Sequence, residues 1–131
     1  MPPDDKGITD DTELWRRIPP DQMTDDDQVP SGWRPSTGNF DKYEMSVVIA
    51  AESVGGLDGL LSGWEGFGVA SFTAGEVRQL EFGVVRDPDP KLPGHALVVG
   101  NKSHGKRNRL ARLCRLIRVP RPIPGQSAGD G

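Results

Sequence analysis

Short apolar runs, separated by glycine, proline and polar residues, recur along the middle of the chain. Residues 45–51 form a β-branched run between polar flanks, which is typical of a central strand. Further apolar runs cover 68–72, 83–86 and 96–100, and each lies beside a glycine or proline turn signal. This pattern predicts a small twisted mixed sheet of about four or five strands.

The region before this sheet has a weaker pattern. Leu14 to Ile18 mixes apolar and basic positions and stops at Pro19, which predicts a short edge strand or an extended segment leading into the domain. Residues 21–38 are polar and rich in aspartate, glycine and proline, which is typical of a long loop. Loops of this length inside a small domain often carry function.

Two short helices are predicted between the strands. Apolar residues over 57–64 have helical spacing, but the glycines among them favour a short or irregular helix. Thr73 and Glu76 have the spacing of a capping box, in which each side chain bonds the other residue's backbone N–H. A helix over about 74–81 is therefore expected, with Gly83 as its left-handed cap.

The C-terminal region carries the clearest helical pattern. Leu110, Leu113, Cys114 and Ile117 follow the i, i+3, i+4, i+7 spacing, which predicts an amphipathic helix over about 103–118. We expect this helix to pack on one face of the sheet, with those four side chains buried together. The basic side chains expected on its exposed face are Arg109, Arg112 and Arg115. The fold class predicted from these elements is α+β.

Composition suggests where the domain begins and ends. The chain has 131 residues, about the length of one domain, and only 34% of them are apolar. Gly (17) and Pro (12) are both abundant, so part of the chain is expected to be loop or tail. We predict a disordered acidic tail over 1–13, a single globular α/β domain over 14–119, and a Pro/Gly-rich tail over 120–131.

Targeting signals and cysteine usage narrow the class of protein. No run approaches the roughly 18 consecutive apolar residues of a membrane span, and the first residues lack the order of a signal peptide. We therefore expect a cytoplasmic protein with no membrane association. The single cysteine, Cys114, and the two histidines, His95 and His104, fall short of a typical structural zinc site. No metal and no cofactor are expected.

Charge is unevenly distributed along the chain. The net charge of −3 divides into −8 over residues 1–60 and +5 over residues 61–131. Eight basic and no acidic residues lie between Lys102 and Arg121. This asymmetry fits either neutralisation within the fold or an end of the domain that faces a polyanion. The candidate anion-binding residues are Lys102, Lys106, Arg107, Arg109, Arg112 and Arg115.

One glycine-containing segment resembles a phosphate-binding motif. Residues 100–107 satisfy the phosphate-loop pattern except at its last position, and they lie between a predicted strand and a predicted helix. Arg107 stands where a serine or threonine would hold Mg²⁺, and little chain follows that could supply a second metal carboxylate. The pattern therefore favours an ordinary turn from strand to helix.

The long loop offers another candidate site. Arg34, Ser36 and Thr37 place a guanidinium and two hydroxyls near aromatic residues, and a guanidinium suits a carboxylate or a phosphate. His95, at the start of a predicted strand, could approach them. The alternative is structural, with Arg34 tied to an aspartate and His95 hydrogen-bonded within the fold. A small enzyme built on this group requires Arg34, Ser36 and His95 to converge in one pocket.

A family resemblance rests on four segments, residues 14–20, 34–40, 45–47 and 93–96. The chain has the sequence Arg-Pro-Ser-x-x-x-Phe from Arg34 to Phe40 and a His-Ala strand start at His95. In these features it resembles a group of small bacterial proteins, and the resemblance spans most of residues 14–118. No activity is known for that group, so the resemblance implies a stand-alone domain and no particular function.

Three functional hypotheses follow. The first is a non-catalytic accessory or binding domain that recognises a protein partner, for instance one encoded in the same operon, because the sequence has no evident catalytic constellation. The second is a nucleic-acid or phosphoanion-binding domain that uses the basic C-terminal helix. The third, a small enzyme with an Arg/Ser/His site, is the least favoured.

Overall fold

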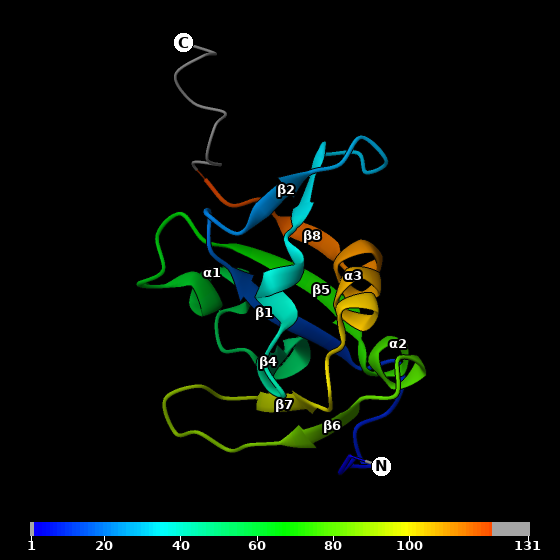
Figure 1. Cartoon of the computed structure of the whole chain (residues 1–131). Helices are drawn as coiled ribbons and strands as arrows, with labels where there is room; N and C mark the ends of the chain where they lie inside the picture. The colour runs from blue at the N-terminus through cyan, green and yellow to red at the C-terminus, as the bar shows by residue number, and fades with distance from the viewer. Residues whose placement is uncertain (1, 122–131) are drawn as a thin grey trace.

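A six-stranded antiparallel sheet runs through the computed structural model, which describes residues 2–121 (Figure 1). The strands lie in the order β6 (Gly83–Arg86), β7 (His95–Val99), β4 (Glu44–Ile49), β1 (Glu13–Ile18), β5 (Gly68–Thr73) and β8 (Arg115–Arg118). All neighbouring strands pair antiparallel. The predicted α+β class is confirmed. The sheet is larger than the predicted four or five strands, and its described strand pairs are all antiparallel, whereas a mixed sheet was predicted.

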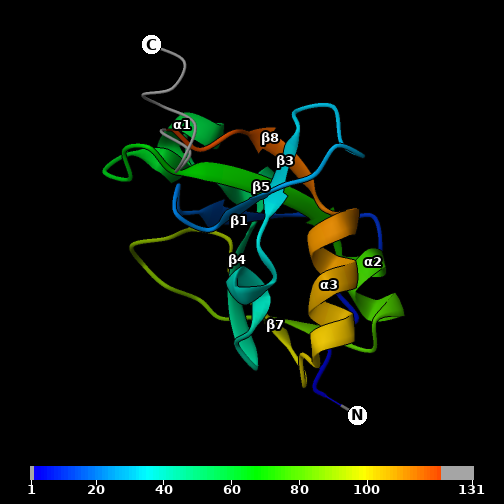
Figure 2. The ribbon, with the colours of Figure 1, turned by 45° about the horizontal axis from the view of Figure 1, so that its top comes forward.

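The helices lie on both faces of this sheet. On one face are α2 (Ala74–Gln79), α3 (His104–Leu113) and the 3-10 turn η1 (Thr37–Phe40), and the main core lies beneath them (Figure 1 and Figure 2). On the other face, α1 (Gly56–Leu61) covers a smaller cluster formed by Val48, Leu60 and Val69. The second face is therefore covered over a smaller area.

The prediction that Leu14 to Ile18 forms an edge strand is wrong, because β1 lies in the middle of the sheet. It pairs with β5 along its whole length, and Leu14 and Ile18 are completely buried. The basic positions made this segment look like an exposed edge. In the fold, the heads of Arg16 and Arg17 find acceptors in distant parts of the chain.

The predicted C-terminal helix is shorter than its apolar spacing suggested. It ends at Leu113, and the chain then becomes extended at Cys114 and forms β8 beside β5. Only Leu110 of the four expected core residues is fully buried; Leu113 and Cys114 are half-buried, and Ile117 is 39% exposed. Strand pairing with β5 satisfies backbone groups that a continued helix would have left at an open sheet edge. The predicted exposure of Arg109, Arg112 and Arg115 is confirmed.

The capping box at the start of α2 is confirmed. The Thr73 hydroxyl accepts from the Glu76 backbone N–H at 3.1 Å, and the Glu76 carboxylate accepts from the Thr73 N–H at 2.8 Å. The predicted left-handed cap at Gly83 is wrong, because Glu81 takes the positive φ of 69°. Gly83 belongs to β6, where an added Cβ would collide with the backbone oxygen of Pro3.

The N-terminal segment packs on the domain instead of forming the expected tail over 1–13. The backbone N–H of Asp5 donates to Val84 at 2.7 Å, and Ile8 is 2% exposed in the main core. Arg78 forms ion pairs with Asp4 at 3.0 Å and Asp10 at 2.7 Å. The aspartates that suggested disorder are therefore partly neutralised by α2. Most of the other predicted tail, 122–131, lies outside the described residues.

The loop predicted over 21–38 contains a small hairpin. Its strands β2 (Met23–Asp25) and β3 (Trp33–Pro35) pair antiparallel, with Thr24 opposite Arg34. A second 3-10 turn, η2 (Ala50–Glu52), follows β4. Within residues 2–121, no helix has the length and apolar character needed to cross a membrane.

Candidate functional site

The structure gives Arg34 and His95 different partners. The Nε of Arg34 lies 3.1 Å from the carboxylate of Asp26, so Arg34 ties the β2–β3 hairpin together. The Nδ1 of His95 is 2.9 Å from the backbone oxygen of Asp87, and its Nε2 is 3.1 Å from the hydroxyl of Ser46. Two cavities that His95 lines in the described part of the chain include neither Arg34 nor Ser36. The geometry thus gives the enzyme hypothesis no support.

Ser36 and Thr37 mark the beginning of η1. Ser36 precedes the turn, its side chain makes no capping hydrogen bond there, and its backbone N–H donates to Gln22 at 3.0 Å. Thr37 is the first residue of the turn and is half-buried. These positions connect the hairpin to the core through Phe40, which is fully buried.

Lys102 points into the protein and is unsuitable as an anion-binding residue. It is 6% exposed, and its Nζ donates to the backbone oxygens of Tyr43, Val98 and Gly100 at 2.9, 2.9 and 3.1 Å. Its ammonium also lies 4.6 Å from the ring centroid of Phe82. Burial, reinforced by the nearby charge of Arg16, lowers the pKa of Lys102 to about 8. Lys102 therefore stabilises the turn between β7 and α3 by donating hydrogen bonds to its backbone oxygens.

The other basic residues of α3 and β8 differ in their surroundings. The Nζ of Lys106 lies 3.2 Å from the Oε1 of Glu81, and the Nη2 of Arg115 lies 3.1 Å from the Oε1 of Glu76. Arg112 donates to Asn108 one turn earlier, and Arg109 is exposed. The half-buried Arg107 has a buried Nε without a hydrogen-bond partner among the described residues. Part of the basic charge is therefore already compensated within the domain.

A different arrangement of arginines occurs where β1 and β4 separate. These strands pair only at Leu14 with Ile49 and at Trp15 with Val48. Beyond that point the guanidinium of Arg16 donates from Nη1 to the Ser46 backbone oxygen at 2.8 Å. The side chain of Arg16 thus bridges the two strands where their backbones no longer pair.

Asn39 holds the other edge of this guanidinium. Its backbone oxygen accepts from Nε and Nη2 of Arg16 at 3.2 and 2.8 Å, and its side-chain oxygen accepts from Nε at 2.9 Å. Asn39 is only 3% exposed and donates to the side chain of Gln22. The turn η1 therefore fixes the orientation of Arg16.

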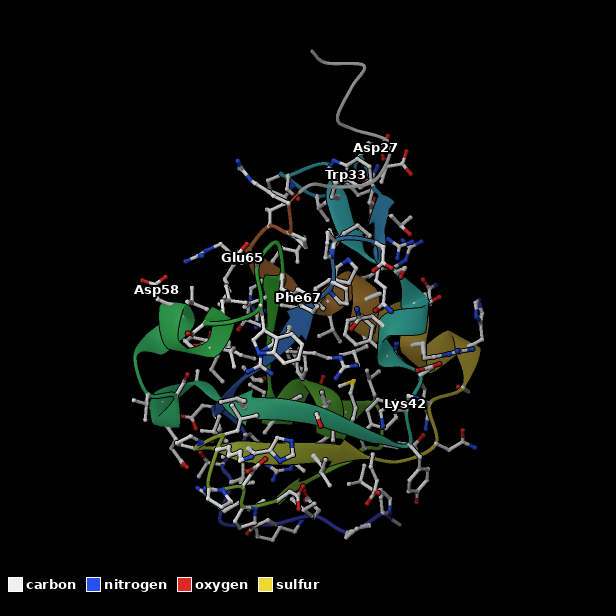
Figure 3. All side chains as sticks on the ribbon, turned by 90° about the vertical axis from the view of Figure 1, so that its left-hand side faces the viewer. Asp27, Trp33, Lys42, Asp58, Glu65 and Phe67 are labelled. Atoms are coloured by element: carbon white, nitrogen blue, oxygen red, sulfur yellow. The ribbon has the colours of Figure 1, made fainter. Side chains whose placement is uncertain are left out.

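A cleft of about 260 Å³ opens above this junction. We call it the arginine–tryptophan cleft, after the side chains that distinguish it. Its lining residues are Trp15, Arg16, Arg17, Pro19, Gln22, Asn39, Ser46, Val47, Val48, Leu60, Trp64, Phe67, Leu92 and His95. Phe67 is seen on this side of the molecule, the side that α1 partly covers (Figure 3).

Arg17 and Trp64 form one wall of the arginine–tryptophan cleft. The guanidinium carbon of Arg17 lies 4.3 Å from the centroid of the Trp64 ring, and its Nε donates to the backbone oxygen of Leu60 at 2.9 Å. Trp64 also meets Phe67 edge to face, with ring centroids 5.1 Å apart. Trp64 nevertheless remains 42% exposed. A large aromatic surface with a fixed cation is thus open to a ligand.

Neither arginine of the cleft forms an ion pair with a carboxylate in the described part of the chain. Burial lowers the pKa of Arg16 to about 10, and the negative charge of Asp41 opposes this change. Burial also lowers the pKa of Arg17. Both guanidinium groups stay charged at neutral pH, so the cleft holds two cations whose acceptors are neutral oxygens.

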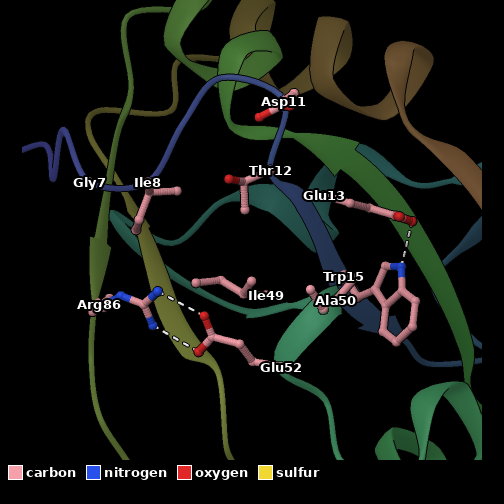
Figure 4. Close-up of a pocket in the computed structure, with 11 residues that line it drawn as sticks. Gly7, Ile8, Asp11, Thr12, Glu13, Trp15, Ile49, Ala50, Glu52 and Arg86 are labelled. Carbon is pink, nitrogen blue, oxygen red and sulfur yellow. Dashed lines mark hydrogen bonds and ion pairs between the residues drawn. The ribbon is translucent and has the colours of Figure 1, made fainter.

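A second cavity, of about 590 Å³, lies between the N-terminal segment and η2 (Figure 4). Arg86 binds both carboxylate oxygens of Glu52 at 2.8 Å, and Trp15 donates to Glu13 at 2.7 Å. These charged groups therefore already have partners. Among residues 2–121, no three metal-ligating side chains of the His, Cys, Asp or Glu type are grouped together.

One feature of the sequence marks the arginine–tryptophan cleft. Two consecutive arginines, Arg16 and Arg17, lie between the apolar residues Trp15 and Ile18, and arginines are seldom buried unless their charged groups have partners. The helical spacing of Trp64 with Leu57, Leu60 and Leu61 indicates a helix face and gives no sign of a site, whereas α1 ends at Leu61 in the structure. Comparison of the chain with known protein families, with curated proteins and with solved structures finds no match.

Proposed function

We propose that this domain is a non-catalytic binding module of the cytoplasm that recognises a segment of a partner protein in the arginine–tryptophan cleft. The observation that carries the proposal is the combination of an exposed indole, Trp64, with two arginines that have no carboxylate partner among residues 2–121. Tryptophan and arginine are the residue types most enriched at the energetic centres of protein interfaces.

The cleft favours a single anionic group over a nucleic acid. Binding to nucleic acid draws much of its affinity from many phosphate contacts, whereas the described lining of this cleft includes two arginines. The chain as a whole is acidic, with a net charge of −3. In α3 and β8, Lys106 and Arg115 are already paired with glutamates. These charges support recognition of a protein segment.

A displayed library of random peptides, selected against the purified protein, tests this proposal. We expect enriched peptides whose affinity falls about tenfold or more in Trp64→Ala, because an interface aromatic of this kind typically contributes over 1.4 kcal/mol. Arg109→Ala is the matched control, since Arg109 is exposed on α3, away from the cleft lining. Its affinities should equal those of the wild type.

Two outcomes would contradict the proposal. One is the absence of any peptide whose binding depends on Trp64 while the variant keeps the wild-type amide spectrum. The other is binding to single-stranded or double-stranded DNA or RNA at about 50 mM salt with an affinity that falls steeply as salt increases. That result would favour nucleic-acid binding by the basic residues of α3.

A further inference from the structure

The side chain of Arg17 is held so that one end of its guanidinium remains available. Its Nε donates to the backbone oxygen of Leu60, and its guanidinium carbon lies over the Trp64 ring. An arginine has five N–H groups in a rigid fork, and the Nη atoms of Arg17 make no hydrogen bond to another described residue. The protein therefore fixes the orientation of the Arg17 guanidinium, while its Nη groups keep their hydrogen-bonding capacity for a ligand.

Arg16 adds a second, deeper cation to the same cleft. Each of its two Nη atoms donates one hydrogen bond, to Ser46 and to Asn39, although each carries two N–H groups. Both partners are neutral oxygens, so the positive charge of Arg16 is not cancelled by them. An anion entering the cleft would be attracted by both arginines in surroundings partly shielded from water.

Beside the arginines the cleft is small, and its lining combines apolar residues with the polar Gln22, Asn39, Ser46 and His95. Trp64, Phe67, Leu60 and Leu92 contribute rings and aliphatic groups beside the arginines. Its volume of about 260 Å³ lies just below the range of about 300–1,000 Å³ that is usual for drug-sized ligands. A space of this size fits one amino-acid residue better than a passing length of peptide chain.

On the basis of the proposed function, we infer that the arginine–tryptophan cleft binds the C-terminal residue of its partner protein. The α-carboxylate of that residue binds the free end of the Arg17 fork within the field of Arg16. Its side chain, aromatic or large aliphatic, packs against Trp64 and Phe67. A planar carboxylate matches two parallel N–H groups of a guanidinium, and a terminal residue supplies the carboxylate and the apolar group together.

Three short acetylated peptides distinguish the source of the carboxylate. The first is acetyl-Gly-Gly-Phe with a free carboxyl group, and the second is the same peptide with a C-terminal amide. The third, acetyl-Gly-Asp-Phe amide, carries its only carboxylate on an internal side chain. Binding is measured by titration of the Trp64 indole N–H and the Arg17 Nε–H signals in NMR spectra.

We expect the free acid to bind about tenfold or more tightly than its amide, because hydrogen bonds between a guanidinium and a carboxylate are stronger than those to a neutral amide. In Arg17→Gln most of this preference should be lost, and only the part that comes from the charge of Arg16 should remain. Arg17→Lys, which keeps the charge but loses the fork, should retain only a small part of the preference. Arg109→Gln is the control and should keep the full preference.

The failures of the two proposals are distinguishable. If the free acid and the amide bind equally and both depend on Trp64, the cleft is a binding site but the carboxylate assignment is wrong. If the internal aspartate peptide binds as tightly as the free acid, the C-terminal assignment is overturned. If none of the three peptides perturbs the Trp64 and Arg17 signals, the inference is overturned whether or not displayed peptides bind elsewhere.

Discussion

The Nη1 of Arg16 donates a hydrogen bond of 2.8 Å to the backbone oxygen of Ser46, across the gap where β1 and β4 stop pairing. In a regular antiparallel pair this acceptor would be bonded by a backbone N–H of the neighbouring strand. A side chain has taken that role here, and the separation of the strands creates the arginine–tryptophan cleft. The integrity of the sheet and the presence of the candidate site are thus linked at one residue.

Replacing Arg16 should destabilise the fold. In Arg16→Met, the backbone oxygens of Asn39 and Ser46 lose their donor at a partly buried position, which typically costs about 1–3 kcal/mol. Urea unfolding measures the change in the free energy of unfolding. Arg109→Met, at an exposed position on α3, should change it by less than about 0.5 kcal/mol. Equal stabilities of the two variants would show that the Arg16 bridge is dispensable.

The cap of α2 gives a local test of the fold. Thr73→Ala removes the acceptor for the Glu76 N–H and should lower the free energy of unfolding by about 1 kcal/mol. Thr73→Ser keeps a hydroxyl acceptor and should retain most of the stability. Thermal and urea unfolding of the two variants give the comparison. A serine variant as unstable as the alanine variant would assign the effect to the methyl group.

Burial along α3 predicts an ordered pair of truncations. Leu110→Ala should cost about 2–5 kcal/mol, because Leu110 is fully buried in the main core. Leu113→Ala should cost clearly less, since Leu113 packs at the edge of that core and is half-buried. The reverse order, measured by urea unfolding, would mean that Leu113 is the more buried of the two.

Lys102 should make stability depend on alkaline pH. Its pKa is about 8 in the folded protein, against an ordinary value of 10.5, so the unfolded chain binds more protons between these two pH values. The contribution of Lys102 to stability therefore rises with pH over that window and is constant and unfavourable below it.

The measurement compares the wild type with Lys102→Met by urea unfolding at several pH values between 8 and 10.5. The stability of the wild type relative to the variant should increase with pH, because the other titrating groups are common to both. A constant difference would mean that the three carbonyl oxygens around Nζ keep Lys102 charged and outweigh its burial.

The thiol of Cys114 should be unreactive. Burial raises its pKa to about 12, so very little thiolate forms near neutral pH. Alkylation by iodoacetamide, followed by mass spectrometry, should be much slower in the folded protein than in the urea-unfolded chain. Rates that agree in the two states would indicate an exposed, activated cysteine and a different packing at the end of α3.

Local signals determined several elements. The β-branched run of β4 and the apolar runs of β5, β6 and β7 were predicted within a residue or two, because short runs of buried β-branched and apolar residues are typical of strands. The capping box of α2 was predicted from Thr73 and Glu76 alone, because its hydrogen bonds connect residues only three apart. For such features, the interacting atoms lie within the same short segment.

The tertiary structure decided where the charged groups go. Whether Arg16 lies at an exposed edge or inside the sheet depends on acceptors at Asn39 and Ser46, which are 23 and 30 residues away. The same holds for the aspartates near the N-terminus, which Arg78 neutralises across the domain. No local periodicity encodes such distant partners.

The end of α3 shows that distant partners also decide backbone structure, which local spacing does not encode. The apolar spacing through Ile117 continued the helical pattern, yet the chain leaves the helix after Leu113 because β5 offers an unpaired edge. By itself, the sequence determined the fold class, four of the strands and the cap of α2, since these follow from burial and short-range bonds. The central position of β1, the strand β8 and the arginine–tryptophan cleft were decided only by the tertiary structure, because they depend on which distant backbone groups remain free to pair.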